Sequence, residues 1–170
     1  HNSRMLRTLP RTVGRAACSG TARLSSSKPV DPLLLRAAYP HFERIQTRWT
    51  DNDAFGHINN AVYYFYMDDA VNAHLFICNN VGLESPRFVA ESSCRYMKPL
   101  SYPKPIDVGL RLSKLGRSSA AYQLGIFAAD ADEASALGTF VHVYVDADGR
   151  PTPICESVRA VLEPLVVPQP

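Results

Sequence analysis

The sequence has no run of apolar residues near the roughly 18–20 that a membrane-spanning helix requires, so we expect no membrane span. Cysteine is scarce, and the spacing of its few copies resembles no metal-binding motif. Because nothing indicates secretion, we expect reduced thiols that mostly pack in the core. The four cysteines are Cys18, Cys78, Cys94 and Cys155.

Acidic side chains are absent from residues 1–30, which carry six basic ones. Residues 31–170 hold the remaining 12 basic and all 16 acidic residues, a net charge of about −4. The overall pI of about 8.4 therefore reflects the N-terminal segment. It is no argument for a nucleic-acid-binding domain, and none is expected.

Residues 5–28 are rich in arginine and serine and lack the continuous apolar stretch of a secretory signal. This composition is typical of a mitochondrial transit peptide, with the matrix as the expected compartment; a disordered basic tail is the alternative. Residues 1–4 precede Met5 and are expected to be an expression remnant. We expect all of residues 1–30 to be disordered and to lie outside the fold.

Hydrophobic periodicity predicts one strand, one long helix and then four strands. Apolar and polar residues alternate over residues 41–49, which indicates a half-buried strand. From Asn59 and Asn60 onward, apolar residues recur every three or four positions until Gly82, which predicts a helix. Residues 87–97, 106–113, 119–129 and 135–145 read as an antiparallel meander, and a short helix is expected near residue 160.

This order of elements predicts an α+β fold in which one helix lies against a curved antiparallel sheet. The helix is apolar over most of its circumference, so we expect protein on more than one of its sides. The open edges of such a sheet favour pairing in a symmetric dimer.

Residues 49–70 read WTDNDAFGHINNAVYYFYMDDA, where Asp51 and Asp53 precede the predicted helix. A carboxylate just ahead of a helix lies near free backbone N–H groups and the positive end of the helix dipole. Attack on a reactive carbonyl needs both an activating group and oxyanion donors. The alternative for Asp53 is a helix cap or turn, and Asp51 is expected to fix the loop. No ligand cluster accompanies the pair at a familiar spacing, so we predict no metal site.

Residues 41–163 resemble the hotdog-fold acyl-coenzyme A thioesterases of the 4-hydroxybenzoyl-coenzyme A thioesterase group. The most specific part is residues 50–63, TDNDAFGHINNAVY, with support from RYMKP at 95–99, GRSS at 116–119 and VHVYV at 141–145. The resemblance implies one α+β hotdog domain over residues 31–166, with a tail at 167–170. It also implies a curved antiparallel sheet of five to six strands wrapped around one long central helix.

The implied activity is hydrolysis of an acyl-coenzyme A thioester to coenzyme A and a carboxylic acid. By resemblance Asp53 is the catalytic residue, as nucleophile or general base. The oxyanion donor is the backbone N–H of Asn60 or of the first turn around it. Coenzyme A is part of the substrate, so no separate cofactor is expected. The implied assembly is a homodimer, or a dimer of dimers, with the cleft between subunits.

Coenzyme A carries phosphates, so its site should offer cations and hydroxyl donors. The candidates, two of which match nucleotide-contacting positions of the family, are Arg117, Ser118 and Ser119, followed by Arg95 and Lys98. Each is otherwise a surface side chain. Tyr63 and Tyr66 are candidates for an acyl pocket, although aromatic side chains on a central helix usually form core.

Three alternatives remain open from the sequence. His57 lies four residues after Asp53, and hotdog-fold hydratases and dehydratases use a histidine with a carboxylate. Some hotdog thioesterases carry their carboxylate on the central helix, where this chain has Asp68 and Asp69; we expect these two to be buried and hydrogen-bonded. The third alternative is a non-catalytic coenzyme A-binding or assembly protein.

Overall fold

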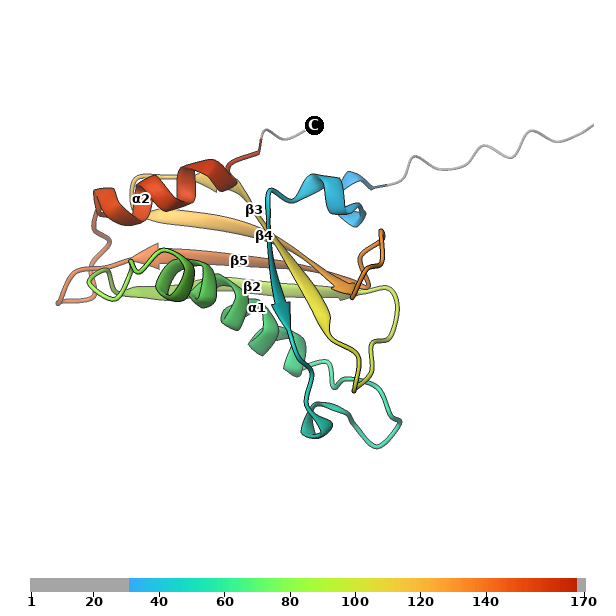
Figure 1. The fold of residues 1–170 in the computed structure, drawn as a ribbon. Helices are drawn as coiled ribbons and strands as arrows, with labels where there is room; N and C mark the ends of the chain where they lie inside the picture. Colours follow the sequence, from blue (N-terminus) through green and yellow to red (C-terminus); the bar gives the residue numbers. More distant parts are fainter. Residues whose placement is uncertain (1–30, 168–170) are drawn as a thin grey trace, which may run out of the picture.

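Five strands form a single antiparallel sheet in the order β1-β3-β4-β5-β2 in the computed structural model, which describes residues 31–167. The predictions for residues 1–30 lie outside this range. Figure 1 shows the sheet with its helices. The strands are β1 (His41–Ile45), β2 (Arg87–Tyr96), β3 (Ile106–Leu115), β4 (Ser119–Ala128) and β5 (Ala136–Tyr144).

The predicted α+β arrangement is confirmed, with two differences in the strands. β1 ends at Ile45, and Trp49–Asp51 form a 3-10 helix where the alternation predicted more strand. β2 pairs with β5 and not with β3, so only β3, β4 and β5 make a meander. As a result β1 and β2 are the two edge strands of the sheet.

The central helix α1 spans Val62–Asn72 and continues as a π-helical segment, Ala73–Cys78. It begins after Asn60 because Asn59 first forms a turn, in which its Oδ1 accepts a hydrogen bond from the N–H of Ala61 at 2.9 Å. The second helix, α2 (Glu156–Leu162), agrees with the prediction. Short 3-10 helices cover Pro32–Leu34, Arg36–Ala38 and Glu163–Leu165.

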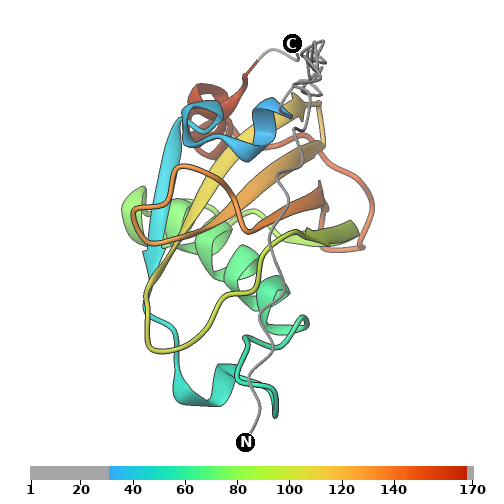
Figure 2. The ribbon, with the colours of Figure 1, turned by 90° about the vertical axis from the view of Figure 1, so that its right-hand side faces the viewer.

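One face of α1 packs against the inner face of the sheet (Figures 1 and 2). The buried positions recur at helical spacing and form one stripe: Tyr63, Tyr66, Met67, Ala70, Val71, His74 and Leu75. Gly138 on β5 permits the close approach, because a Cβ there would overlap Sδ of Met67. Phe65 and Ile77 face away and are 62% and 81% exposed. Within one chain, protein therefore covers the side of α1 that faces the sheet, and the side that carries Phe65 and Ile77 is exposed.

Successive side chains of each strand point to opposite faces of the sheet. On β3, Val108 and Leu110 join the core beneath α1, to which α2 adds Val158 and Leu162. On the outer face, Tyr39, Phe127 and Ala134 form a smaller cluster with residues 34–42. No helix within residues 31–167 is both long and apolar enough to cross a membrane.

Candidate active site

A hollow of about 360 Å³ lies at the start of α1. Three segments line it: the loop before α1, the first turn of α1, and the end of β2. The lining residues are Asp53, His57, Ile58, Asn60, Tyr63, Tyr96, Met97, Lys98 and Pro99. Five of the residues selected from the sequence therefore meet at one place, although the loop and the end of β2 lie about 40 residues apart in the chain.

The loop around Asp53 is held by its own backbone. The N–H of Asp53 donates to the carbonyl oxygen of His57 at 2.7 Å. Its Oδ1 accepts from the N–H of Phe55 at 2.8 Å and from that of His57 at 3.3 Å. Gly56 completes the turn with φ +79°, a conformation that favours glycine. The other carboxylate oxygen, Oδ2, has no hydrogen-bond partner among residues 31–167, which leaves it available to the hollow.

Asp51 and Tyr66 stabilise this loop through buried hydrogen bonds. Asp51 is buried, and its Oδ2 accepts hydrogen bonds from the N–H of Arg48 at 2.6 Å and from the hydroxyl of Tyr66 at 2.7 Å. Burial and this bond to the carboxylate raise the pKa of Tyr66. Tyr66 thus lies in the core, as the alternative for it allowed, and does not line the hollow, so its assignment to an acyl pocket is wrong. Asp51 has the loop-fixing position that the sequence indicated.

The first turn of α1 offers a hydrogen-bond donor to the hollow. The backbone N–H of Asn59 donates to the carbonyl of Asp51. The N–H of Ala61 donates to the side chain of Asn59, and that of Val62 donates to the carbonyl of Asn59. Within the described part of the chain, the N–H of Asn60 has no acceptor. This donor lies at the positive end of the helix dipole, where a developing oxyanion is stabilised.

Two tyrosines form an aromatic wall beside these groups. The rings of Tyr63 and Tyr96 pack edge to face with their centroids 5.0 Å apart. Burial raises the pKa of both hydroxyls, so both remain neutral near pH 7. The hydroxyl of Tyr96 donates to the carbonyl oxygen of Asn60 at 2.9 Å. Tyr96 and Met97 were not selected from the sequence, although both lie inside the RYMKP motif.

Lys98 and Arg95, from the same motif, lie in different environments. Lys98 lines the hollow, and its Nζ pairs with Oε2 of Glu133 at 2.6 Å. Arg95 pairs with Asp31 at 2.9 Å and lines a different pocket, together with Tyr39 of the outer-face cluster. The structure therefore brings Lys98, but not Arg95, to the predicted catalytic residues.

The predicted coenzyme A residues of the β3–β4 turn lie far from the hollow within one chain. β3 begins just after the segment that contacts the loop and runs for ten residues to this turn, which at strand geometry is about 30 Å. Arg117 is exposed, whereas Ser118 and Ser119 are half-buried. The turn is closed by the N–H of Gly116 donating to the carbonyl of Ser119 at 2.7 Å.

The two aspartates inside α1 are exposed, so the prediction that they are buried is wrong. They come directly after the buried residues Tyr66 and Met67 in the sequence and lie on the exposed side of α1. Asp68 lines a second hollow of about 360 Å³ with Arg87 and His142, among others, and accepts a hydrogen bond from Asn72 at 2.9 Å. Partial burial and the neighbouring Asp69 raise the pKa of Asp68.

His142, quoted above in the VHVYV motif, lies in this second region. It is only 2% exposed, and burial together with the charge of Arg87 lowers its pKa to about 4. The histidine is therefore neutral near pH 7 and belongs to the wall of the second hollow, remote from Asp53.

Comparisons with known proteins match the region of the chain that contains the hollow. The model of the thioesterase-like superfamily matches residues 47–162. The crystal structure of the PA5185 protein from Pseudomonas aeruginosa shares 41% identity, over 78% of this chain and 96% of that chain, with a TM-score of 0.75. A thioesterase from Thermus thermophilus, complexed with coenzyme A and Zn, is 30% identical over 75% of this chain and 95% of its own, with a TM-score of 0.63.

More distant structures agree in fold alone. A 1,4-dihydroxy-2-naphthoyl-CoA thioesterase from Synechocystis is 12% identical, over 71% of this chain and 93% of that one, with a TM-score of 0.66. No match was found among curated proteins. Together with the five-stranded sheet and its central helix, these likenesses confirm the predicted hotdog fold.

Proposed function

The chain belongs to the thioesterase-like superfamily, and from this premise we propose that it hydrolyses an acyl-coenzyme A thioester to coenzyme A and a carboxylic acid. One observation carries the proposal: Asp53 and Asn60 line the same hollow, and within residues 31–167 neither Oδ2 of Asp53 nor the backbone N–H of Asn60 has a hydrogen-bond partner. Hydrolysis of a thioester requires these two functions at one carbonyl group.

Asp53 supplies the attacking or activating group. In the direct route one carboxylate oxygen bonds to the carbonyl carbon, the C–S bond breaks and coenzyme A leaves as thiolate; water then hydrolyses the mixed anhydride. In the other route Asp53 accepts a proton from water as the water oxygen attacks the same carbon; the C–S bond of the tetrahedral species then breaks, and coenzyme A leaves as thiolate. Only the direct route can place solvent oxygen in the side chain, and it does so when water attacks the aspartyl carbon of the anhydride. Mass spectrometry of the protein after turnover in heavy-oxygen water distinguishes them.

Asn60 contributes through its backbone N–H and not through its side chain. As the carbonyl carbon becomes tetrahedral, its oxygen gains negative charge, and a donor fixed at the start of a helix stabilises that charge without reorganisation. The bond from the Tyr96 hydroxyl to the carbonyl oxygen of Asn60 fixes the next peptide unit along the chain, between Asn60 and Ala61. The aromatic wall of Tyr63 and Tyr96 provides an apolar surface for part of the acyl group.

His57 is the basis of the second candidate function, the hydration or dehydration of an acyl thioester. Its imidazole lines the hollow with Asp53, which is the observation in favour. Its backbone makes both of its hydrogen bonds to Asp53, so a loop-shaping role explains the residue equally well. A lyase would change enoyl absorbance without releasing thiol, and His57→Ala would abolish that change.

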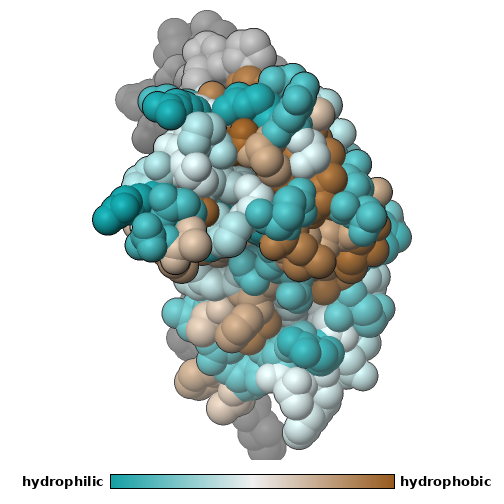
Figure 3. Space-filling view, turned by 90° about the vertical axis from the view of Figure 1, so that its left-hand side faces the viewer, coloured by the Kyte–Doolittle hydropathy of each residue, from teal (hydrophilic) through white to brown (hydrophobic). Residues whose placement is uncertain are grey.

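The complete substrate site requires a second subunit in this proposal. Arg117, Ser118 and Ser119 lie at the far end of the sheet from Asp53, so the partner's copy of the turn would bind the nucleotide. The edge strand β2 exposes Phe88 and Val89, which supports an interface there. Figure 3 looks at the end of the molecule where α1 ends and β2 begins, and shows apolar side chains grouped among polar ones. Sedimentation velocity distinguishes the proposed dimer from a dimer of dimers.

The N-terminal composition supports a mitochondrial location. Residues 1–30 carry six basic and no acidic side chains, as import signals do. The test is microscopy of the full chain fused to a fluorescent protein, against a fusion that lacks residues 5–28. Loss of mitochondrial signal in the shorter fusion is expected, and an unchanged distribution contradicts this location.

The activity itself is tested by thiol release from a panel of acyl-coenzyme A substrates with short, branched, medium and aromatic acyl groups. Wild type should release thiol from at least one of them, and Asp53→Asn should not. Asp148→Asn is the matched control, since Asp148 is an exposed loop aspartate that does not line the hollow. Equal rates for wild type and Asp53→Asn would refute hydrolysis by this site. A rise in melting temperature with coenzyme A but no turnover indicates a binding protein.

A further inference from the structure

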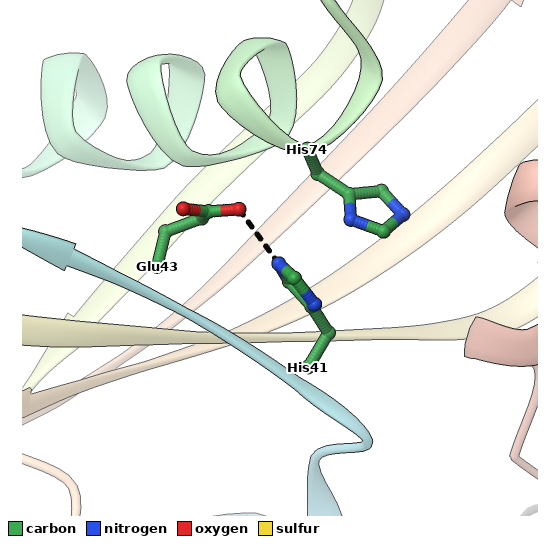
Figure 4. Close-up of side chains that lie close together, drawn as sticks. All are labelled: His41, Glu43 and His74. Carbon is green, nitrogen blue, oxygen red and sulfur yellow. Dashed lines mark hydrogen bonds and ion pairs between the residues drawn. The ribbon is translucent and has the colours of Figure 1, made fainter. Parts of the chain in front are cut away.

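A second group of functional side chains lies where β1 faces the far end of the helix (Figure 4). His41 and Glu43 are two residues apart on β1, so their side chains point to the same face of the strand. His74 comes from the π-helical segment that continues α1. One nitrogen of each histidine and one carboxylate oxygen all lie within 4.8 Å of one another. Within residues 31–167 this is the only such group of three.

The ring of His74 packs against that of His41 but makes no hydrogen bond of normal geometry among residues 31–167. It is only 7% exposed, and neither of its ring nitrogens has a hydrogen-bond partner among the described residues. A buried polar group without a partner costs free energy, and native proteins rarely leave one unexplained. The pair formed by His41 Nε2 and Glu43 Oε1, 2.6 Å apart, accounts for two members of the group but leaves His74 unsatisfied.

We propose that His41, Glu43 and His74 bind a divalent transition metal ion, with Zn²⁺ as the ion that suits them best. Two imidazoles and one carboxylate form a ligand set that zinc accepts, at about 2.0–2.2 Å from each donor atom. Donor atoms arranged tetrahedrally at that distance lie roughly 3.3–3.5 Å apart. In the proposed site the His41–Glu43 contact of 2.6 Å opens, and one nitrogen of His74 moves closer to both donor atoms.

This metal site is separate from the proposed active site. Asn60 and His74 are fourteen residues apart along the helix, which corresponds to about 20 Å. The side chains of His41 and Glu43 remain 29% and 18% exposed, so water can complete the coordination. The ion would link the edge strand β1 to the end of the helix, which assigns it a stabilising role and no part in thioester hydrolysis.

The proposal reverses our expectation from the sequence that no metal is bound. The two ligands on β1 and the third on the helix are separated by 31 residues, with no motif that connects them. Only the packing of the helix end against β1 brings them together. The ring centroids of His41 and His74 are 4.3 Å apart, so this packing brings the two side chains into contact.

The test uses the full chain after treatment with a chelator and dialysis into metal-free buffer. Calorimetric titration with Zn²⁺ should show one saturable site per chain, and saturation should raise the melting temperature. Removal of a residue that merely supports a metal ligand costs roughly 10–100-fold in affinity, so Glu43→Gln and His41→Gln should each weaken binding at least about tenfold. His57→Gln, a histidine at the other end of the helix, should bind zinc as wild type does.

A second measurement on wild type does not depend on the folding of any variant. Co²⁺ in place of Zn²⁺ should give the intense visible absorption of four- or five-coordinate cobalt, and Zn²⁺ should displace it. Absence of a saturable site, an unchanged weak spectrum of aqueous cobalt, or equal zinc affinity for wild type and Glu43→Gln would each overturn the proposal.

Discussion

The loop of residues 51–60 and the β3–β4 turn of residues 116–119 were both expected to contact substrate, but they differ in what they leave open. In the loop, Oδ2 of Asp53 and the N–H of Asn60 have no partner within residues 31–167. In the turn, the backbone bonds are closed, by the Gly116–Ser119 pair and by the N–H of Ile154 donating to the carbonyl of Arg117 at 2.9 Å. What remains available there is the exposed side chain of Arg117 and the half-buried hydroxyl groups of Ser118 and Ser119.

This difference assigns the two regions different tasks. Chemistry requires fixed groups with unused hydrogen-bonding capacity, which the loop has. Binding of a phosphate requires only an accessible cation, which the turn has. Because about 30 Å separates them in one chain, the proposed function requires that they meet one substrate across a subunit interface. Substitutions in the loop should therefore alter turnover, and those in the turn should alter substrate affinity.

The largest effect is expected for Asp53→Asn. Loss of the carboxylate removes the nucleophile or base, so kcat should fall by roughly 10²–10⁴-fold with little change in KM. Steady-state thiol release measures both constants. Asp68→Asn, in the second hollow, serves as control and should retain most of the activity. If instead Asp68→Asn is the inactive variant, the catalytic carboxylate lies on the helix and not in the loop.

A smaller loss is expected when the Asn60 N–H is removed. Asn60→Pro lacks the donor, and loss of one oxyanion donor costs about 10²–10³-fold in kcat. Asn60→Ala keeps the backbone N–H and should retain nearly all of the turnover. Circular dichroism and the melting temperature establish that both variants are folded. Equal losses in the two variants would mean that the side chain, and not the backbone, carries the role.

Arg117→Ala should act on affinity alone. An exposed ion pair with a phosphate is worth up to about 1 kcal/mol, so KM should rise about fivefold while kcat stays constant. Lys114→Ala, an exposed cation near the same turn, provides the comparison and should change KM less. A fall in kcat without a change in KM would place Arg117 next to the reacting carbonyl.

Mixed subunits test the separation of the two regions. When Asp53→Asn and Arg117→Ala chains exchange subunits, half of the sites in each mixed dimer regain both wild-type residues if they come from different chains. Thiol release at low substrate should then rise several-fold above the mean of the two separate variants. If it remains at the mean, each site is built from a single chain.

The smallest effect is expected for Tyr66→Phe, beneath the loop. The variant removes the hydroxyl that donates to Asp51, leaves one buried carboxylate oxygen with fewer donors, and should lower the free energy of unfolding by about 1–2 kcal/mol. Urea denaturation measures this change. Tyr64→Phe is the matched control, because the Tyr64 hydroxyl has no hydrogen-bond partner among the described residues. An unchanged stability would show that the Asp51–Tyr66 bond does not support the loop.

Local sequence patterns were sufficient to predict most of the fold and about half of the residues that line the hollow. The alternation in β3 and the spacing from Tyr63 to Leu75 reflect burial on one face, so strand and helix follow from sequence. Asp53, His57 and Asn60 meet because they are close in the chain. Tyr96 and Met97 reach the hollow through the pairing of β2 with β5, which no local pattern encodes.

The misplaced residues have the same physical cause. Tyr66 was a candidate for an acyl pocket or for the core, and its place in the buried stripe of α1 directs it to the core, where it contacts Asp51. Asp68 was expected to be buried, but it follows that stripe and is exposed. His41 and His74 were not selected at all, because their proximity depends on how β1 and the helix end pack. Tertiary contacts, not residue types, decide these positions.

The most informative single measurement is a crystal structure of the protein with a non-hydrolysable coenzyme A thioester analogue. We expect the carbon at the thioester position to lie about 3–3.5 Å from the carboxylate of Asp53, with its oxygen about 2.7–3.1 Å from the N–H of Asn60. An analogue whose reacting carbon lies in the hollow beside Asp68, or on the outer face near Arg95, would contradict hydrolysis by the loop before α1.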